Sequence, residues 1–351
     1  MAAIEPEPES EKSTLFPKIT GKLDEFITNI SNHPCFLESA AIPMVGTVKL
    51  HGSHSDVVIY HDNSIIVQSR NQTCLGVGKH DVFGMSAFLT PLRSEFLELK
   101  ARIYNRFLKS SSGAKIEDGY PLIISGEWIG PGVQKGVAID RLPSKCFVII
   151  SISINGKWQE DELYSDLENV GAGIYNISRG GFFRHSLPVN DTEDSLRSLQ
   201  PLADAVEKEC PFARSFGVLG TGEGIVWKVL QPSEHTKYWL KMKGPSFQGR
   251  TSGRNVNTKL GRAEMTKAFA KDVLPEWRLE QGWQYLGEMG MERSRRGTQA
   301  FLKWLVDDVK GEEKGDIERL NLDTALLEKQ LNHLGVAWYF ERLNQEGTES
   351  G

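Results

Sequence analysis

The stretch Thr47-Val48-Lys49-Leu50-His51-Gly52-Ser53 is the starting point for interpreting the rest of the chain. It predicts the end of one strand, Val45 to Leu50, a tight turn at Gly52 and a return strand from Asp56 to Tyr60. Because glycine has no side chain, a ligand's phosphate can approach closely beside the lysine. A lysine near a hairpin turn is more often a solvated edge residue, so this stretch alone leaves both interpretations open.

Further motifs follow in order along the chain. Gly126-Glu127-Trp128 ends a predicted buried strand, Gly222-Glu223-Gly224 precedes another, and Trp239 to Lys243 carries two lysines. Lys241 and Lys243 alternate along a strand and therefore project to the same side. Two ammonium groups on one face are unfavourable in an apolar core but can bind a phosphate group together. Alternatively, the two lysines are solvent-exposed and protect an edge strand from pairing with another chain.

Together these motifs resemble those of the covalent lysine nucleotidyltransferases, the superfamily of polynucleotide ligases and capping enzymes. Lys49-Leu50-His51-Gly52 is similar to the lysine motif of the RNA ligase 2-like branch, whereas DNA ligases and capping enzymes typically carry aspartate before the glycine. The resemblance covers about Val45 to Lys243. It implies an α+β fold whose nucleotidyltransferase domain is ATP-grasp-like, with antiparallel sheets and flanking helices.

The resemblance also implies a role for each matching residue. Lys49 is the nucleophile, Glu127 contacts the ribose hydroxyls, and Glu223 helps to hold the hydrated metal ion. Solvent-facing side chains at strand ends are the alternative for Arg70 and for both glutamates. The implied ATP-binding residues are Lys49, Leu50, Arg70, Glu127, Glu223, Lys241 and Lys243.

The implied reaction has three steps. ATP adenylates Lys49 and pyrophosphate leaves, AMP then passes to an RNA 5′-phosphate, and an RNA 3′-hydroxyl finally attacks this end and expels AMP. Lys49 must lose its proton before it attacks, and nearby cations favour that loss. The implied cofactors are ATP and Mg²⁺, with Mn²⁺ as an alternative metal.

Three positions depart from the family pattern. His54 stands where asparagine is usual, and Val48 where an acid often faces adenine. Ile150-Ser151-Ile152 replaces a Phe-Asp-Ile strand whose ring stacks on adenine, and Phe147 lies only nearby in the sequence. The preference for adenine over guanine therefore rests on the resemblance alone.

Length and composition indicate an ordinary globular protein of two domains, with 351 residues of which 39% are hydrophobic and 25% charged. The net charge of −5 argues against a generally basic nucleic-acid coat but allows a local basic groove. Residues 1–14 are expected to form a disordered acidic tail and residues 15–250 the adenylyltransferase domain. Residues 251–345 are expected to form a small all-α C-terminal domain, because apolar residues recur there at helical spacing.

The cysteines and the N-terminal residues indicate the compartment. The four cysteines lie far apart without metal-ligand spacing, which favours reduced thiols; they are Cys35, Cys74, Cys146 and Cys210. The first residues resemble neither a signal peptide nor a transit peptide, and no apolar run approaches the roughly 18 residues of a membrane span. We expect a cytoplasmic or nuclear location and no membrane partner.

These observations predict an ATP-dependent RNA ligase that acts in RNA repair on 5′-phosphate and 3′-hydroxyl ends. A capping-type or end-adenylating nucleotidyltransferase is a second interpretation, and His51 in place of aspartate counts against it. A non-catalytic RNA-binding protein on a ligase scaffold is a third. Retention of Lys49, both glutamates and both late lysines counts against that interpretation.

Overall fold

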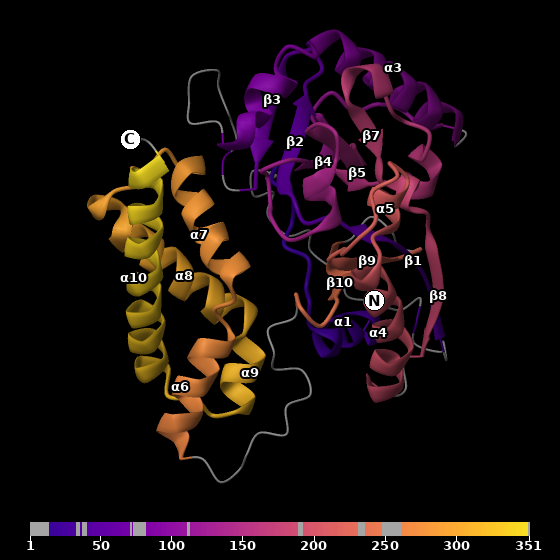
Figure 1. Ribbon diagram of the computed structural model, residues 1–351. Helices are drawn as coiled ribbons and strands as arrows, with labels where there is room; N and C mark the ends of the chain where they lie inside the picture. The colour runs from indigo at the N-terminus through magenta and orange to yellow at the C-terminus, as the bar shows by residue number, and fades with distance from the viewer. Residues whose placement is uncertain are drawn as a thin grey trace.

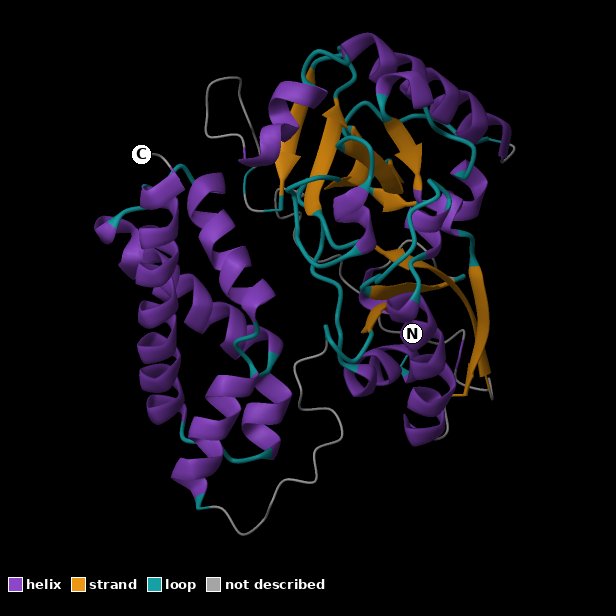
Figure 2. Ribbon diagram, viewed as in Figure 1, coloured by secondary structure: helices purple, strands orange, loops and turns teal. Residues whose placement is uncertain are grey.

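Two sheets with flanking helices form the first part of the protein, and a group of helices forms the second (Figures 1 and 2). This arrangement confirms the expected α+β class. Of the expected acidic tail, only Thr14 belongs to the described chain. The computed structural model describes residues 14–32, 36, 41–70, 72, 82–110, 113–188, 192–230, 236–247 and 261–349.

The first sheet brings three strand ends together. Its order is β10-β9-β1-β8, all antiparallel, with β1 Ala41–Lys49, β8 Phe183–Pro188, β9 Gly224–Val229 and β10 Trp239–Lys243. Gly224 pairs with Lys49 on one side and with Lys243 on the other. The two lysines and the glutamate that precedes Gly224 therefore meet at one end of the sheet.

The second sheet has the order β3-β2-β4-β5-β6, and β7 pairs in parallel with β5. Its register sets His54 opposite Glu127. The strands are β2 Ser53–Ile59, β3 Ile65–Ser69, β4 Leu122–Ile129, β5 Cys146–Ile154, β6 Lys157–Trp158 and β7 Ile174–Asn176.

The hairpin expected around Gly52 is wrong. The strand that ends at Lys49 pairs with β8 and β9, whereas the next strand pairs with β3 and β4, so the chain crosses from one sheet to the other. Gly52 is needed for close approach, because a Cβ at this position would lie 2.5 Å from the Trp128 carbonyl oxygen. The lysine motif is therefore the junction between the two sheets.

Helices cover the sheets around two neighbouring apolar cores. Phe26 and Ile30 of α1 pack with α4 against the first sheet, and Phe96 and Ile103 of α3 pack against the second. The helices are α1 Leu23–Ser31, α2 Met85–Leu89, α3 Arg93–Ser110, α4 Thr192–Lys208 and α5 Pro211–Arg214. Short 3₁₀ helices are η2 Val82–Gly84, η3 Ala138–Arg141, η4 Asp161–Tyr164, η5 Val170–Ala172, η6 Ile177–Gly180, η7 Thr236–Tyr238 and η8 Arg295–Gly297.

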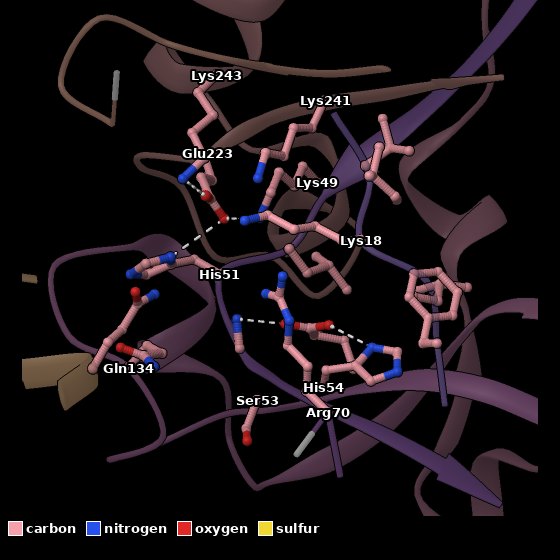
Figure 3. Close-up of a pocket in the computed structure, with 18 of the residues that line it drawn as sticks. Lys18, Lys49, His51, Ser53, His54, Arg70, Gln134, Glu223, Lys241 and Lys243 are labelled. Atoms are coloured by element: carbon pink, nitrogen blue, oxygen red, sulfur yellow. Dashed lines mark hydrogen bonds and ion pairs between the residues drawn. The ribbon is translucent and has the colours of Figure 1, made fainter. Parts of the chain in front are cut away.

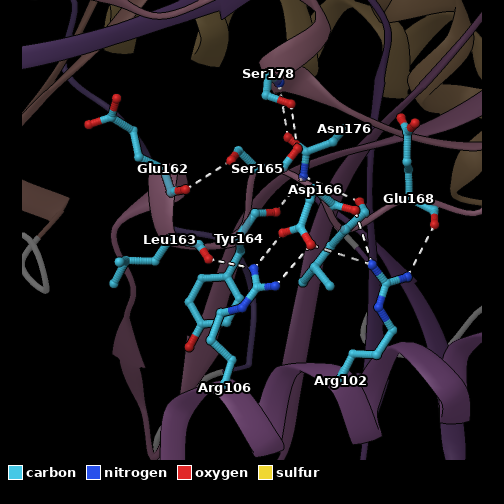
Figure 4. Close-up of polar contacts among 11 residues, drawn as sticks. Arg102, Arg106, Glu162, Leu163, Tyr164, Ser165, Asp166, Glu168, Asn176 and Ser178 are labelled. Atoms are coloured by element: carbon cyan, nitrogen blue, oxygen red, sulfur yellow. Dashed lines mark hydrogen bonds and ion pairs between the residues drawn. The ribbon is translucent and has the colours of Figure 1, made fainter. Parts of the chain in front are cut away.

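Polar contacts tie the segment after β6 to the body of the fold (Figure 4). Arg106 of α3 donates to both carboxylate oxygens of Asp166, at 2.5 and 2.9 Å, and to the Leu163 carbonyl oxygen at 2.6 Å. The Asn176 side chain donates to the Tyr164 carbonyl oxygen at 3.0 Å. These bonds hold the segment that begins with η4 against α3 and β7.

The helical part has apolar cores of its own. Helix α10 packs along α6 and α8, and Leu327 and Leu331 of α10 are fully buried. None of the described helices is both long and apolar enough to cross a membrane. The domain boundary near residue 250 stays a prediction, because residues 248–260 lie outside the described chain. The helices are α6 Arg262–Asp272, α7 Glu276–Glu288, α8 Thr298–Glu312, α9 Lys314–Arg319 and α10 Thr324–Glu349.

Candidate active site

A cavity of about 380 Å³ lies between the ends of the two sheets and the helical part. Strands β1, β9 and β10 supply one wall, β2 and β4 a second, and α7 and α8 a third. All of the ATP-binding residues predicted from the sequence line this cavity, namely Lys49, Leu50, Arg70, Glu127, Glu223, Lys241 and Lys243. Figure 3 labels Lys49, Arg70, Glu223, Lys241 and Lys243. Their roles stay predictions, but the structure brings all seven together.

Glu223 is surrounded by cationic and imidazole nitrogens. Its Oε2 accepts a hydrogen bond from Lys49 Nζ at 2.6 Å and lies 3.3 Å from His51 Nδ1, and its Oε1 lies 3.0 Å from Lys243 Nζ. Only 1% of the Glu223 side chain is exposed. Burial raises the pKa of this carboxyl, but the charges of Lys49, Lys243 and His51 outweigh burial and hold it well below its ordinary value. Glu223 is therefore ionised and links the two lysines.

Gly224 fixes the position of Glu223. Its φ of +155° favours glycine, and a Cβ there would collide with the Met242 carbonyl oxygen. The Gly244 amide donates to the Glu223 carbonyl oxygen at 2.9 Å. The backbone thus holds Glu223 against the end of β10.

Glu127 belongs to a second, separate charge cluster. The Gly52 amide donates to Glu127 Oε1 at 3.1 Å, and His54 Nδ1 lies 3.9 Å from Glu127 Oε2. On its other side, His54 Nε2 lies 3.0 Å from the fully buried Asp56, which also accepts a hydrogen bond from Gln68 at 3.0 Å. Sequence reasoning noted His54 but missed Asp56. Its signal was a carboxylate directly before the apolar run Val57 to Ile59.

Charge and burial oppose each other at His54. Burial lowers its pKa, but the carboxylates of Asp56 and Glu127 raise it by more, so that the pKa lies above its ordinary value although Arg70 opposes this change. The Phe16 ring covers the imidazole at a centroid distance of 4.5 Å. Burial is also the main reason why the pKa of Glu127 is raised.

We expect His54 to stabilise the fold mainly in its protonated form. Because its pKa is raised on folding, this stabilisation is complete below the unfolded pKa of about 6.5 and is lost as the pH rises through the folded pKa. His54→Asn should lower the Tm by roughly 2–4 °C at pH 6. The difference in Tm between the wild type and His54→Asn should be smaller at pH 9. Thermal unfolding at both pH values checks this, with the exposed His61 as the matched His→Asn control. A Tm loss that does not vary with pH would contradict it.

Lys228, which lines the cavity, forms a buried ion pair with Asp161. Lys228 Nζ contacts Asp161 Oδ1 and Oδ2 at 2.8 and 2.7 Å and Ser151 Oγ at 2.5 Å, and it lies 4.0 Å from the centroid of the Trp239 ring. Lys228 and Asp161 were missed, although a lysine within an apolar strand was a readable signal. Phe147 is fully buried in the second core and is not part of the cavity wall.

The third wall was not predicted from the sequence. Lys243 Nζ lies 4.9 Å from the centroid of the Trp277 ring, and the same ring meets His51 edge-on at 6.5 Å. Gln134 donates to Gln284 of α7 at 2.9 Å. No local sequence pattern predicts these contacts, because they depend on how the helical part packs against the two sheets.

A family model for RNA ligases matches residues 42–243. The chain belongs to the RNA ligase family. The match covers the β-sheet part that carries the candidate site, and it confirms the resemblance seen in the motifs. No curated protein is similar enough to this family member to count as a match.

Solved structures of an RNA ligase from Naegleria gruberi match over part of the chain. A mutant with AMP and Mn is 17% identical, with a TM-score of 0.43, and the match covers 68% of this chain and 59% of that one. A mutant with ATP and Mn gives 17% identity, a TM-score of 0.44 and the same two coverages. The ligase with pyrophosphate gives 18%, a TM-score of 0.41, and 71% and 64% coverage. This RNA ligase family member thus spans about three fifths of the length of these proteins.

Metal binding in this family member depends on the donor atoms in the cavity. Within the described part of the chain, no group of three or more His, Cys, Asp or Glu side chains could hold a metal ion. Mg²⁺ is usually bound by one or two carboxylates together with substrate phosphates, so a complete protein cage is not required. Glu223 is compatible with this mode and stays the predicted metal ligand.

Proposed function

We propose that this protein is an ATP-dependent RNA ligase that joins 5′-phosphate and 3′-hydroxyl RNA ends through a lysine–AMP and an RNA-adenylate. The family match supports the reaction class. The observation that carries the proposal is the contact of Lys49 Nζ with Glu223 in a cavity that Lys241, Lys243 and Arg70 also line. An amine nucleophile, a carboxylate partner and several phosphate-binding cations thus share one site.

Glu223 positions the nucleophile in this proposal. In the ligand-free protein, its carboxylate accepts a hydrogen bond from Lys49 Nζ at 2.6 Å. Attack needs the neutral amine, because a protonated amine has no free electron pair. Bound Mg²⁺ supplies charge neutralisation for the phosphates. The neutral amine then forms the N–P bond to the α-phosphate as the bond to pyrophosphate breaks.

The other residues that line the cavity can bind the phosphates, the ribose and the base. Lys241, Lys243 and Arg70 lie where they can stabilise the charge that develops on the phosphate oxygens and on leaving pyrophosphate. Glu127, anchored by the Gly52 amide, is the candidate acceptor for the ribose hydroxyls. Ile150, Val226 and Trp239 also line the cavity and offer apolar surface to the base.

The thiols favour a reducing compartment. Cys146 and Cys210 are free and buried, and burial raises the pKa of the Cys146 thiol to about 12. Inert, reduced cysteines of this kind are usual in the cytoplasm and the nucleus. We therefore place the proposed ligase in one of these two locations.

Sealing is tested by supplying labelled ATP with Mg²⁺ and then a 5′-phosphorylated RNA with a free 3′-hydroxyl. Label should appear first on the protein and then on the RNA 5′ end, and a joined product should follow. Transfer to RNA without joining would instead support an end-adenylating enzyme. RNA binding without any label on the protein would support the non-catalytic interpretation.

We predict that a chain ending after Gly249 still forms lysine–AMP but seals RNA about tenfold less well or worse, because phosphate contacts from the helical part would be lost. The apolar clusters of the first part contain no described residue beyond Phe247, which supports independent folding. Both steps are measured for the full and shortened chains at several salt concentrations. Equal sealing by the two chains would assign the helical part another purpose.

A further inference from the structure

Two lysines from distant parts of the sequence converge on one carboxylate of the helical part. Lys241 Nζ lies 2.9 Å from Glu312 Oε2, and Lys18 Nζ lies 2.9 Å from Glu312 Oε1. Both lysines project into the cavity that contains Lys49 (Figure 3). Glu312 is the last residue of α8 and lines the same cavity.

The fold of the first part brings the two lysines together. The segment before α1 lies along the edge strand β10, where Thr20 forms a parallel bridge with Leu240 and the Lys241 amide donates to the Thr20 carbonyl oxygen at 2.9 Å. Lys18 is thereby placed beside Lys241. Burial lowers the pKa of Lys241 to about 8, although Glu312 opposes the change. Two converging cations, one of them largely buried, favour an anion between them.

Glu312 lies at the C-terminal end of its helix, where a glutamate is unfavourable. The C-terminal end of a helix carries partial negative charge, which disfavours a carboxylate there. Burial also raises the pKa of Glu312, but Lys241 and Lys18 outweigh burial and hold the pKa far below its ordinary value. The two lysines therefore meet a concentrated negative charge, which is what a phosphate group would present to them.

The two parts meet around this cavity mainly through polar groups. Each of the apolar clusters formed by described residues lies within one part, and none spans both. The contacts across the boundary include Gln134 with Gln284, Lys241 with Glu312, and the Lys243 ammonium with the Trp277 ring. Polar boundaries of this kind permit relative domain motion, so Glu312 can leave the lysines without disrupting a core.

We propose that Lys18 and Lys241 form a phosphate-binding subsite and that Glu312 occupies it until a phosphate group takes its place. The proposal rests on the proposed function for the source of that phosphate, which is either the nucleoside triphosphate or the RNA strand. It goes beyond the predicted motifs, because Lys18 precedes all of them and Glu312 belongs to the helical part. A phosphate that binds the subsite must displace Glu312. Phosphate binding is therefore coupled to separation of the end of α8 from the two lysines.

The test removes the negative charge of Glu312. We expect Glu312→Gln to bind inorganic tripolyphosphate, ATP or a 5′-phosphorylated RNA oligonucleotide roughly tenfold more tightly, the scale of one charged hydrogen bond. Titration calorimetry without added metal measures the first two probes, and fluorescence anisotropy measures the RNA. Lys18→Met in the Glu312→Gln background should reverse the gain. Glu328→Gln is the matched control, because Glu328 pairs with Lys310 at 2.7 Å on the surface of the same helical part.

The probes distinguish the two sources of phosphate. A gain for tripolyphosphate and ATP alone assigns the subsite to the nucleotide, and a gain for RNA alone assigns it to the strand. Unchanged affinity for all three probes in folded Glu312→Gln, or an equal gain in Glu328→Gln, overturns the proposal. Lysine–AMP formation is measured in the same variants. If the adduct forms without a gain in affinity, only the subsite fails; if affinity rises but no variant or wild type forms the adduct, the proposed function fails.

Discussion

Glu223→Gln should reduce formation of lysine–AMP by about 10²-fold or more, the usual cost of losing a charge-stabilising contact at a reacting group. The substitution keeps the size of the side chain but removes the charge that Lys49 and Lys243 share at 2.6 and 3.0 Å. Glutamine can still accept a hydrogen bond, but it does not neutralise either ammonium group. Lys243→Ala removes one of those partners, and we expect a loss of similar size.

The measurement is the rate of label transfer from ATP to protein in variants whose thermal unfolding confirms that they are folded. Glu162→Gln is the matched control, because it removes a carboxylate that pairs with Arg184 at 2.6 Å outside the cavity. Near-normal adenylation by folded Glu223→Gln would mean that the buried carboxylate only holds the sheet ends together.

Lys49→Ala should abolish the adduct altogether. In the proposed reaction, the Lys49 amine attacks the α-phosphate in line, so the substitution removes the nucleophile. Lys49→Arg is the sharper variant. It keeps a cation beside Glu223 and so preserves the charge balance, while the guanidinium stays protonated and does not act as a nucleophile.

The order of the motifs was enough to predict seven residues of the site. All seven residues named from the sequence line one cavity, and Glu223 contacts Lys49 and Lys243 directly. Lys49, Glu223 and Lys243 meet because the ends of β1, β9 and β10 lie side by side in one sheet, whereas Glu127 comes from β4 of the other sheet. The pairing itself was not readable, so a hairpin was expected where the chain around Gly52 crosses between sheets.

The residues of the site that were not predicted from the sequence depend on tertiary packing. Asp56 and Asp161 are acids within or just after strands, and their meaning appears only once His54 and Lys228 lie beside them. Glu312 belongs to a helix whose apolar stripe was readable. Its contact with Lys241 depends on how the helical part packs against the first part, and the spacing of apolar residues does not predict that packing.

The central claim is that Lys49 becomes covalently adenylated, and intact mass spectrometry tests it most directly. After incubation with ATP and Mg²⁺, the wild-type chain should gain the mass of one AMP, and peptide mapping should place it on Lys49. Lys49→Arg and Lys49→Ala should gain nothing under the same conditions. An AMP adduct that survives in either folded variant would place the nucleophile elsewhere and contradict the account.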